Sequence, residues 1–330
     1  QTLSNVATST SAIWTTASGG TLLLNGVVDI NANNNTSRTL TIAGAGATTI
    51  SGVIQNSFAG STGNLIVNAP GGVVTVSGPN TYSGATTLTD GKLNINSATA
   101  LGSGTFNLNG GTIDNTSGSA KTLTNNQPVS IGGSFAYGNA AGTAANNLNL
   151  GTGAVSAPAA GFTLTLNGAG ALTFGGALAG HDGAAARTIT VNNGSGTTAA
   201  SAVNFGGLAL ASAATNRTTV ITGSGGINIT GPVVNGGTST ASVLTYSGSG
   251  SLTLAGDNTY GGATTINDGT LILSGDNTSA TGGTTLNGGV LQLASANGLA
   301  GTAFINFKGG TLQFSAAGTT DVSNKFSIGS

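Results

Sequence analysis

The stretch that decides the fold runs from Gly72 to Asn96 and reads GVVTVSGPNTYSGATTLTDGKLNIN. Nearly the same stretch returns 178 residues later, from Gly250 to Ser274, as GSLTLAGDNTYGGATTINDGTLILS. A second pair, RTLTIAGAGATTISGVI from Arg38 and RTTVITGSGGINITGPVV from Arg217, lies in nearly the same relation. A chain that repeats a large block built from short apolar segments and turns is most simply an elongated solenoid, in which each repeat contacts its neighbours.

Alternation of apolar and polar residues predicts the secondary structure. Leu40-Thr41-Ile42, Val74-Thr75-Val76 and Leu252-Thr253-Leu254 each place Thr on one side and apolar side chains on the other. A two-residue period with Thr on the outer side is typical of β-strands. Gly-Gly, Asn-Gly and Asp-Gly pairs interrupt these segments after about 3 to 6 residues and supply the positive φ that tight turns need. We therefore expect an all-β chain of short strands.

The spacing of the copies distinguishes two all-β architectures, an antiparallel sandwich or propeller and a parallel β-helix. NGGTI at Asn109–Ile113 matches KGGTL at Lys308–Leu312 at an offset of 199 residues, so the second copy has gained about 21 residues, visible from Leu273 to Leu293. An insertion of this size is one additional coil, which a solenoid accommodates because each rung contacts only its neighbours. The sequence predicts a right-handed parallel β-helix of roughly 15 rungs.

The two copies also define the expected domain organisation. They form internal quasi-repeats at about residues 38–133 and 217–330. Because the rungs of a solenoid share one core, we expect residues 1–330 to form a single continuous β-solenoid.

Composition excludes several classes of protein. Only 5% of the residues are charged, whereas an average domain is about a quarter charged. A hydrophobic content of 38% and a net charge of −1 argue against disorder, and the seven Lys and Arg are too dispersed for a nucleic-acid site. No apolar run approaches the roughly 18 residues of a membrane helix. The absence of Cys excludes disulfides and is compatible with export. We expect neither a nucleic-acid partner nor membrane insertion.

The segment Gly250–Leu271 resembles the passenger-associated transport repeat of bacterial autotransporter passengers. In that family a strand LTL leads into Gly-x-Asn-Thr-Tyr-x-Gly, followed by Thr-Thr-Ile and Gly-Thr-Leu. Gly72–Leu93 matches the same pattern, with Leu88 in the Ile place and Lys92 in the Thr place. The two good copies cover about 45 residues. The resemblance implies a secreted right-handed β-helix displayed or released at the bacterial cell surface, and therefore an extracellular location.

The acidic residues offer little for catalysis. All eight are Asp, and Asp90 and Asp268 occupy equivalent Asp-Gly turns, which favours a role in turn formation. Asp257 and Asp276 lie 19 residues apart, so they could stack on successive rungs as a surface pair or a weak cation site. Carbohydrate-cleaving sites need paired carboxylates with a supporting base. We expect no catalytic residue, no metal, no cofactor and no enzyme activity.

The only adjoining histidine and carboxylate are His181 and Asp182, with Arg187 close by. Neighbours on a strand point to opposite faces, and the flanking Gly180 and Gly183 suggest hinges. We expect an exposed polar loop here and no catalytic dyad.

Threonine pairs keep two alternatives open. The pairs at 86 and 87, 264 and 265, and 284 and 285 could form flat arrays for binding ice or carbohydrate, provided that they lie in register. β propensity explains them equally well. A polysaccharide-cleaving enzyme is the remaining alternative, disfavoured by the sparse acids.

The function expected from the sequence is a structural rod outside the bacterium, either a head-to-tail filament subunit or a passenger stalk that supports adhesion or biofilm formation. FSIGS at Phe326–Ser330 aligns with VSIGG at Val129–Gly133, so placing Gln1 after Ser330 nearly completes the interrupted pattern. Exposed strand edges at solenoid ends favour such stacking. Cell-surface or polysaccharide ligands are the other partners left open. The expected stacking residues are Gln1, Thr2, Leu3, Phe326, Ile328 and Ser330.

Overall fold

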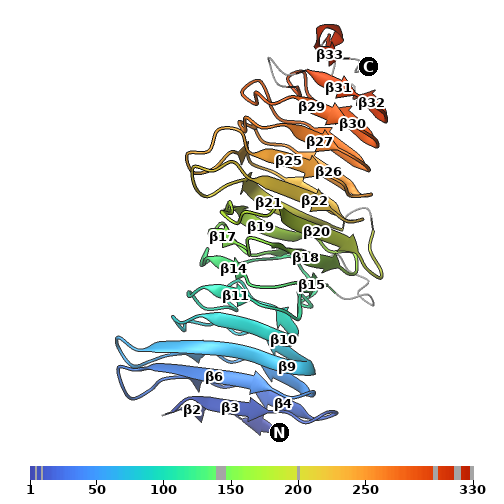
Figure 1. Ribbon diagram of the computed structural model, residues 1–330. Coiled ribbons are helices and arrows are strands. Elements are labelled where there is room, and N and C mark those ends of the chain that lie inside the picture. The colour runs from blue at the N-terminus through green and yellow to red at the C-terminus, as the bar shows by residue number, and fades with distance from the viewer. Residues whose placement is uncertain are drawn as a thin grey trace. The chain divides into compact units, whose positions relative to one another are not determined.

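The computed structural model describes residues 1–3, 6–8, 10–138, 146–198, 201–299, 304–315 and 321–327. Nearly all regular structure in these ranges is short β-strand, and the strands pair in parallel with strands one coil further along the chain (Figure 1). The only helix found there is a 3-10 turn, η1 (Ser323–Lys325). The predicted all-β parallel β-helix is confirmed. No helix in the described ranges is long and apolar enough to span a membrane.

The chain forms two compact units. Unit 1 comprises residues 1–153, 167–173 and 195–200, and unit 2 comprises residues 154–166, 174–194 and 201–330. A single continuous solenoid, its handedness and its number of rungs stay predictions.

Unit 1 is built on two long parallel ladders and two shorter sets. The long strands β9 (Thr62–Val76) and β10 (Thr86–Ile95) take part in both ladders. The first ladder also contains β3 (Ala12–Thr15), β6 (Ser37–Ala43), β11 (Phe106–Leu108) and β14 (Val129–Ile131). The second also contains β1 (Thr2–Leu3), β4 (Thr21–Leu24), β7 (Ala47–Ile50), β12 (Thr112–Asp114) and β15 (Phe135–Tyr137). The shorter sets are β2 (Val6–Ala7), β5 (Val28–Asp29) and β8 (Ile54–Gln55), and β13 (Lys121–Thr122), β16 (Leu148–Asn149) and the start of β19 (Leu172–Leu178).

Unit 2 has the same construction. One ladder contains β18 (Gly161–Leu166), β20 (Arg187–Asn193), β22 (Thr218–Thr222), β25 (Val243–Tyr246), β27 (Thr264–Ile266), β29 (Thr284–Leu286), β31 (Ile305–Phe307) and β33 (Phe326–Ser327). The other contains β21 (Ala202–Ala209), β23 (Gly226–Ile229), β26 (Ser251–Leu254), β28 (Thr270–Leu273), β30 (Val290–Leu293) and β32 (Thr311–Phe314). β17 (Val155–Ser156) pairs with the end of β19, and β24 (Val233–Val234) pairs with the end of β21.

The core of each unit follows the two-residue period of the strands. Leu252 and Leu254 are fully buried, whereas Thr253 between them lies on the outer face. Leu252 stacks on Leu271, and Leu271 on Leu291, in consecutive coils. Since like side chains lie over like, the interior is a column of aliphatic contacts that each coil shares with its neighbours.

The additional coil of the second copy lies where the sequence places it. Thr264 pairs with Thr284 and Leu271 with Leu291, so residues 273–293 add one coil on top of the repeat. The Asp-Gly turns are equivalent too. Asp90 and Asp268 each accept a hydrogen bond from the next glycine N–H, at 2.6 and 2.8 Å. Those glycines have positive φ, which residues with a Cβ rarely adopt.

Candidate functional site

The exposed loop expected around His181 is found, but the His181 side chain itself is not exposed as expected. The imidazole is only 3% exposed, and His181 forms a parallel bridge with Ala211. Gly180 permits this because a Cβ there would overlap the carbonyl of Ala211. Asp182 and residues 184–186 are exposed, so the loop that follows His181 lies at the surface and within residues 179–186 only the His181 side chain is buried.

The hydrogen bond of His181 identifies its tautomer. Nε2 lies 3.1 Å from the carbonyl oxygen of Thr218, at the start of β22. A carbonyl only accepts, so Nε2 carries the proton and Nδ1 of the neutral ring is an acceptor. Nδ1 is buried and has no partner. Burial and the positive charge of Arg187 hold the pKa of His181 below its usual value, and Arg217 adds to this. The hydrogen bond with Thr218 and the charge of Asp182 act in the opposite direction.

Arg187, at the start of β20, is fully buried. Its two terminal nitrogens donate to the carbonyl oxygens of Ala179, at 2.6 Å, and Ala209, at 3.1 Å. Burial lowers the pKa of Arg187 to about 10. Within the described ranges no carboxylate forms an ion pair with it; the pair found there is Lys92–Asp114, at 2.6 Å in unit 1, in which Asp114 is buried. Arg187 therefore links the backbone at Ala179 to the backbone at Ala209, and its charge is not exposed to solvent.

Asp257 and Asp276 do stack on successive coils. The backbone N–H of Asp276 donates to Asp257 Oδ1 at 3.0 Å. The Asp276 carboxylate accepts from Thr278 N–H at 2.8 Å, from the Thr278 hydroxyl at 2.7 Å and from Asn297 Nδ2 at 3.0 Å, and the Thr278 bonds lead in lowering its pKa. Across the described residues no three His or Asp side chains gather as a metal site would require. The arrangement is that of a turn ladder.

The two threonine pairs of unit 2 lie in register, whereas Thr87 of unit 1 pairs with Ile66 and Asn107, and only one member of each pair faces outward. The first members, Thr86, Thr264 and Thr284, are buried. The outer members of unit 2 form a single row from Thr245 through Thr265 and Thr285 to Asn306. The array is one residue wide on each coil, half the width that two outward threonines would give.

The buried threonines have partners that the sequence analysis missed. The Tyr82 hydroxyl lies 2.5 Å from Thr86 Oγ1, and the Tyr260 hydroxyl lies 2.5 Å from Thr264 Oγ1. Both pairs sit in the repeat at a spacing of four residues, and both tyrosines are inside the core. The conserved spacing of Tyr and Thr in the two copies of NTYxGATT was the available signal.

Four of the expected stacking residues can be placed. Thr2 and Leu3 form β1 and pair with Leu23 and Leu24, and the amino group of Gln1 donates to the carbonyl oxygen of Thr21 at 2.9 Å. Phe326 pairs with Ile305. Ile328 and Ser330 lie outside the described residues. Head-to-tail stacking stays a prediction.

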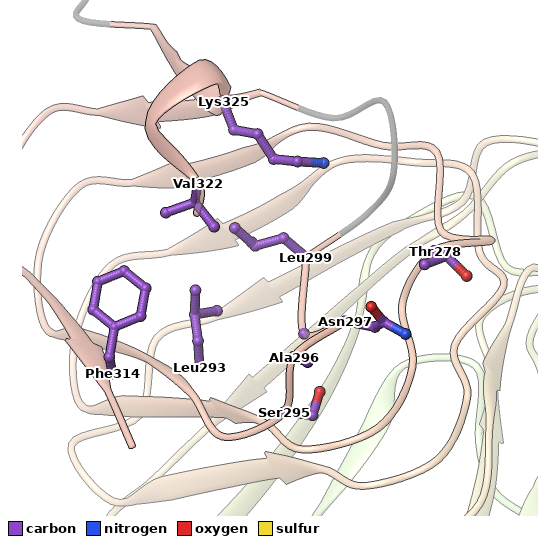
Figure 2. A pocket seen from close by; sticks show the side chains of 10 residues that line it. Thr278, Leu293, Ser295, Ala296, Asn297, Leu299, Phe314, Val322 and Lys325 are labelled. Carbon is purple, nitrogen blue, oxygen red and sulfur yellow. The ribbon is translucent and has the colours of Figure 1, made fainter. Parts of the chain in front are cut away.

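Two hollows lie among the last described coils of unit 2. In the first, of about 190 Å³, Leu293, Leu299, Phe314 and Val322 face a common space, with Asn297 across from them (Figure 2). The second, of about 470 Å³, is lined by uncharged side chains. They include Thr285, Phe304, Asn306 and Phe326.

Phe304 in the second hollow is 62% exposed, whereas Phe106 in the first copy is fully buried and occupies the place that Ile305 takes in the second copy. Leu101 precedes Phe106 by five residues, whereas Leu299 precedes the inward Ile305 by six. This single extra residue moves Phe304 to the outer face, because shifting a strand by one residue exchanges its faces. The sequence contained this signal.

Comparison with known proteins supports the repeat assignment. The family model described as passenger-associated-transport-repeat matches residues 71–95, 244–272 and 268–293. The first two matches contain Gly72–Leu93 and Gly250–Leu271, the segments that carry the resemblance, so the predicted resemblance is confirmed. The third contains the additional coil, which is itself a copy of the repeat. No curated protein and no solved structure matches the chain.

Proposed function

From a parallel β-helix that carries passenger-associated transport repeats, we propose the function of a structural scaffold in a secreted or surface-displayed bacterial protein. As a passenger stalk or a filament subunit it would hold other parts of the protein, or other cells, away from the bacterial surface. The repeat itself suggests secretion or surface display. The scaffold role goes further and is our inference.

The observation that carries the proposal is that the side chains with potential for catalysis form hydrogen bonds to the protein's own backbone. Arg187 bonds to two backbone carbonyls, His181 lies against a third, and the Asp257–Asp276 pair forms a turn ladder. Each of these groups stabilises the coil that contains it or the next one. A catalytic group has to reach substrate, which the buried Arg187 and His181 do not, and the carboxylates of Asp257 and Asp276 accept turn hydrogen bonds.

Two experiments test the scaffold proposal, one on the location of the protein and one on enzyme activity. An antibody against the chain should label intact bacteria that produce it, and electron microscopy should reveal its density outside the cell envelope. Incubation of the purified chain with bacterial and plant polysaccharides should release no reducing ends. Labelling confined to permeabilised cells, or steady release of reducing ends, would contradict the proposal.

Resistance to a broad protease provides a further check. Stacked strands leave few open segments, so proteinase K should leave most of the native chain intact. Trypsin is unsuitable because the chain has only seven Lys and Arg. Rapid digestion to small peptides under native conditions would exclude a rigid scaffold.

Binding of a neutral glycan is a second candidate function, favoured by the hollow around Phe304. An exposed aromatic ring beside Thr285 and Asn306 offers an apolar face together with hydroxyl and amide groups, and the lining carries no charge. Phe304→Ala should weaken binding of neutral oligosaccharides measured by calorimetry. Phe314→Ala, at the other hollow, is the matched control. Equal binding by the native chain and Phe304→Ala would remove this candidate.

A further inference from the structure

The interior corner of unit 2 at His181 combines two features that are costly in a β-helix core. One is the fully buried Arg187, whose Nε has no partner and which forms no ion pair in the described ranges. The other is the buried His181 Nδ1, also without a partner. Together the two side chains link four places on the chain: the segment after β19, the end of β21, β20 and the start of β22. Buried polar atoms normally have hydrogen-bond partners, whereas at this corner two buried nitrogen atoms have none.

The charges around His181 are mostly positive. Arg187 from β20 and Arg217 just before β22 act on it, and the neighbouring Asp182 is the one negative group that does so. Asp182 is exposed to solvent, which screens its charge. The strands β19, β21 and β22, which pack at this corner, carry no titratable side chain. A proton on His181 would therefore enter a site that already holds an uncompensated cation.

We propose that His181 is an acid-sensitive latch, whose protonation at Nδ1 releases residues 179–186 from the coil. The proton comes from solvent and no covalent bond changes. In the neutral state Nε2–H donates to the Thr218 carbonyl and holds the segment in place. In the protonated state Nδ1–H has no acceptor and the imidazolium lies beside Arg187, so the His181 side chain, which anchors the segment, becomes more stable in water than in the core.

The direction of the pH effect follows from linkage. The pKa of His181 is lowered in the folded state, chiefly by burial and then by Arg187. Stability is therefore complete above the usual histidine pKa of about 6.5 and is lost as the pH falls below it. Between pH 6.5 and the folded-state pKa, each further fall of one pH unit raises the equilibrium constant for opening up to about tenfold.

The composition of the chain makes this titration unusually easy to isolate. His181 is the only histidine, Glu and Cys are absent, and all carboxylate side chains belong to Asp, whose usual pKa is about 3.9. Between pH 7.5 and 5.5 the titrating side chain is therefore His181. One imidazole C2–H resonance would report on it without overlap.

The test combines that NMR titration with amide hydrogen exchange of the full chain at pH 7.5 and 5.5, corrected for intrinsic rates. The reporters are the amides of residues 179–186 and the Ser212 N–H, which donates to the His181 carbonyl at 3.1 Å. The native chain should titrate below pH 6.5 and open up to about tenfold more at pH 5.5. His181→Gln, which keeps a donor but does not titrate, should open equally at both pH values.

A second variant keeps the proposal testable if His181→Gln folds poorly. Asp182→Asn removes the exposed negative charge and should lower the His181 pKa further, whereas Asp90→Asn in unit 1 should not change it. A His181 pKa of 6.5 or above, or the same increase in opening at pH 5.5 in the native chain and His181→Gln, would overturn the latch.

Discussion

The two copies of the repeat, Gly72–Asn96 in unit 1 and Gly250–Ser274 in unit 2, build the same interior from different neighbours. Asn80 Oδ1 accepts the Ile54 N–H at 2.8 Å, and Asn258 Oδ1 accepts the Val233 N–H at 2.7 Å. The Tyr–Thr hydroxyl pair recurs in both copies at the same separation of 2.5 Å. The repeat thus specifies a set of buried polar contacts in addition to its strands.

The copies differ in what lies on the next coil. Asn80 Nδ2 donates to the Ala100 carbonyl at 2.7 Å, and that ends the ladder. Asn258 Nδ2 donates to Asn277 Oδ1 at 2.6 Å, and Asn277 in turn donates to the Gly298 carbonyl at 2.7 Å. The additional coil kept the asparagine and lost the tyrosine. The asparagine joins one coil to the next, whereas the tyrosine bonds within its own coil, so the additional coil continues the ladder without a tyrosine.

The largest effect should come from a charge in the shared core. Leu254→Asp in the second copy and its equivalent Val76→Asp in the first bury a carboxylate among aliphatic side chains and should each cost about 4 kcal/mol or more of unfolding free energy. Thr253→Asp and Thr75→Asp on the outer face should cost less than about 1 kcal/mol. Urea unfolding measures all four. Equal losses at 253 and 254 would mean that the inner and outer faces are misassigned.

Breaking the asparagine ladder should rank next. Asn258→Leu leaves the Val233 N–H and Asn277 Oδ1 buried without partners, and Asn80→Leu does the same to the Ile54 N–H and the Ala100 carbonyl. Each variant should lose about 2 to 6 kcal/mol in urea unfolding, because two orphaned groups cost about 1 to 3 kcal/mol apiece. A much greater loss at Asn258 would show that stacked amides strengthen one another, and the two copies would then not be equivalent.

Deleting the additional coil, residues 274–293, should convert the second copy into the arrangement of the first. Leu273 would then precede Ala294-Ser295-Ala296, as Ile95 precedes Asn96-Ser97-Ala98, and Asn258 could donate to the Gly298 carbonyl as Asn80 does to that of Ala100. We expect a folded chain with unchanged β-type circular dichroism and a smaller loss of stability than in Leu254→Asp. A deletion of ten residues, 274–283, which removes half a coil and shifts the pairing of the coils that follow, is the control and should not fold. Unfolding of the coil deletion would show that the coils are not interchangeable.

The smallest effect should come from the tyrosine hydroxyls. Tyr82→Phe and Tyr260→Phe each remove one hydrogen bond to a buried threonine and should cost about 1 kcal/mol. Tyr246→Phe is the matched control, since the Tyr246 hydroxyl is buried without a partner and its removal should be neutral or stabilising. Thermal unfolding at neutral pH would rank the three. A loss at Tyr246 equal to that at Tyr260 would mean that the Tyr–Thr pair adds nothing specific.

Much of this architecture could be predicted because its determinants are local in the chain. The alternation around Thr253 predicted which side chains are buried, and the Asp-Gly pairs at 90 and 268 predicted tight turns. The additional coil was predicted from the change in offset, since a repeated sequence reports its own insertions. The prediction for His181 was wrong, because a Gly-flanked polar loop gives no local indication that one of its side chains packs inside.

By itself the sequence determined the β-helix, the inner and outer faces of its strands and the presence of three repeat copies. Only the tertiary structure decided which polar side chains meet in the interior. The physical reason is that contacts in a β-helix join residues one or more coils apart, and the coils differ in length. His181 reaches a carbonyl 37 residues away, whereas Asn258 and Asn277 are 19 apart. A strand period fixes the direction of a side chain, but the variable length of the turns fixes its partner.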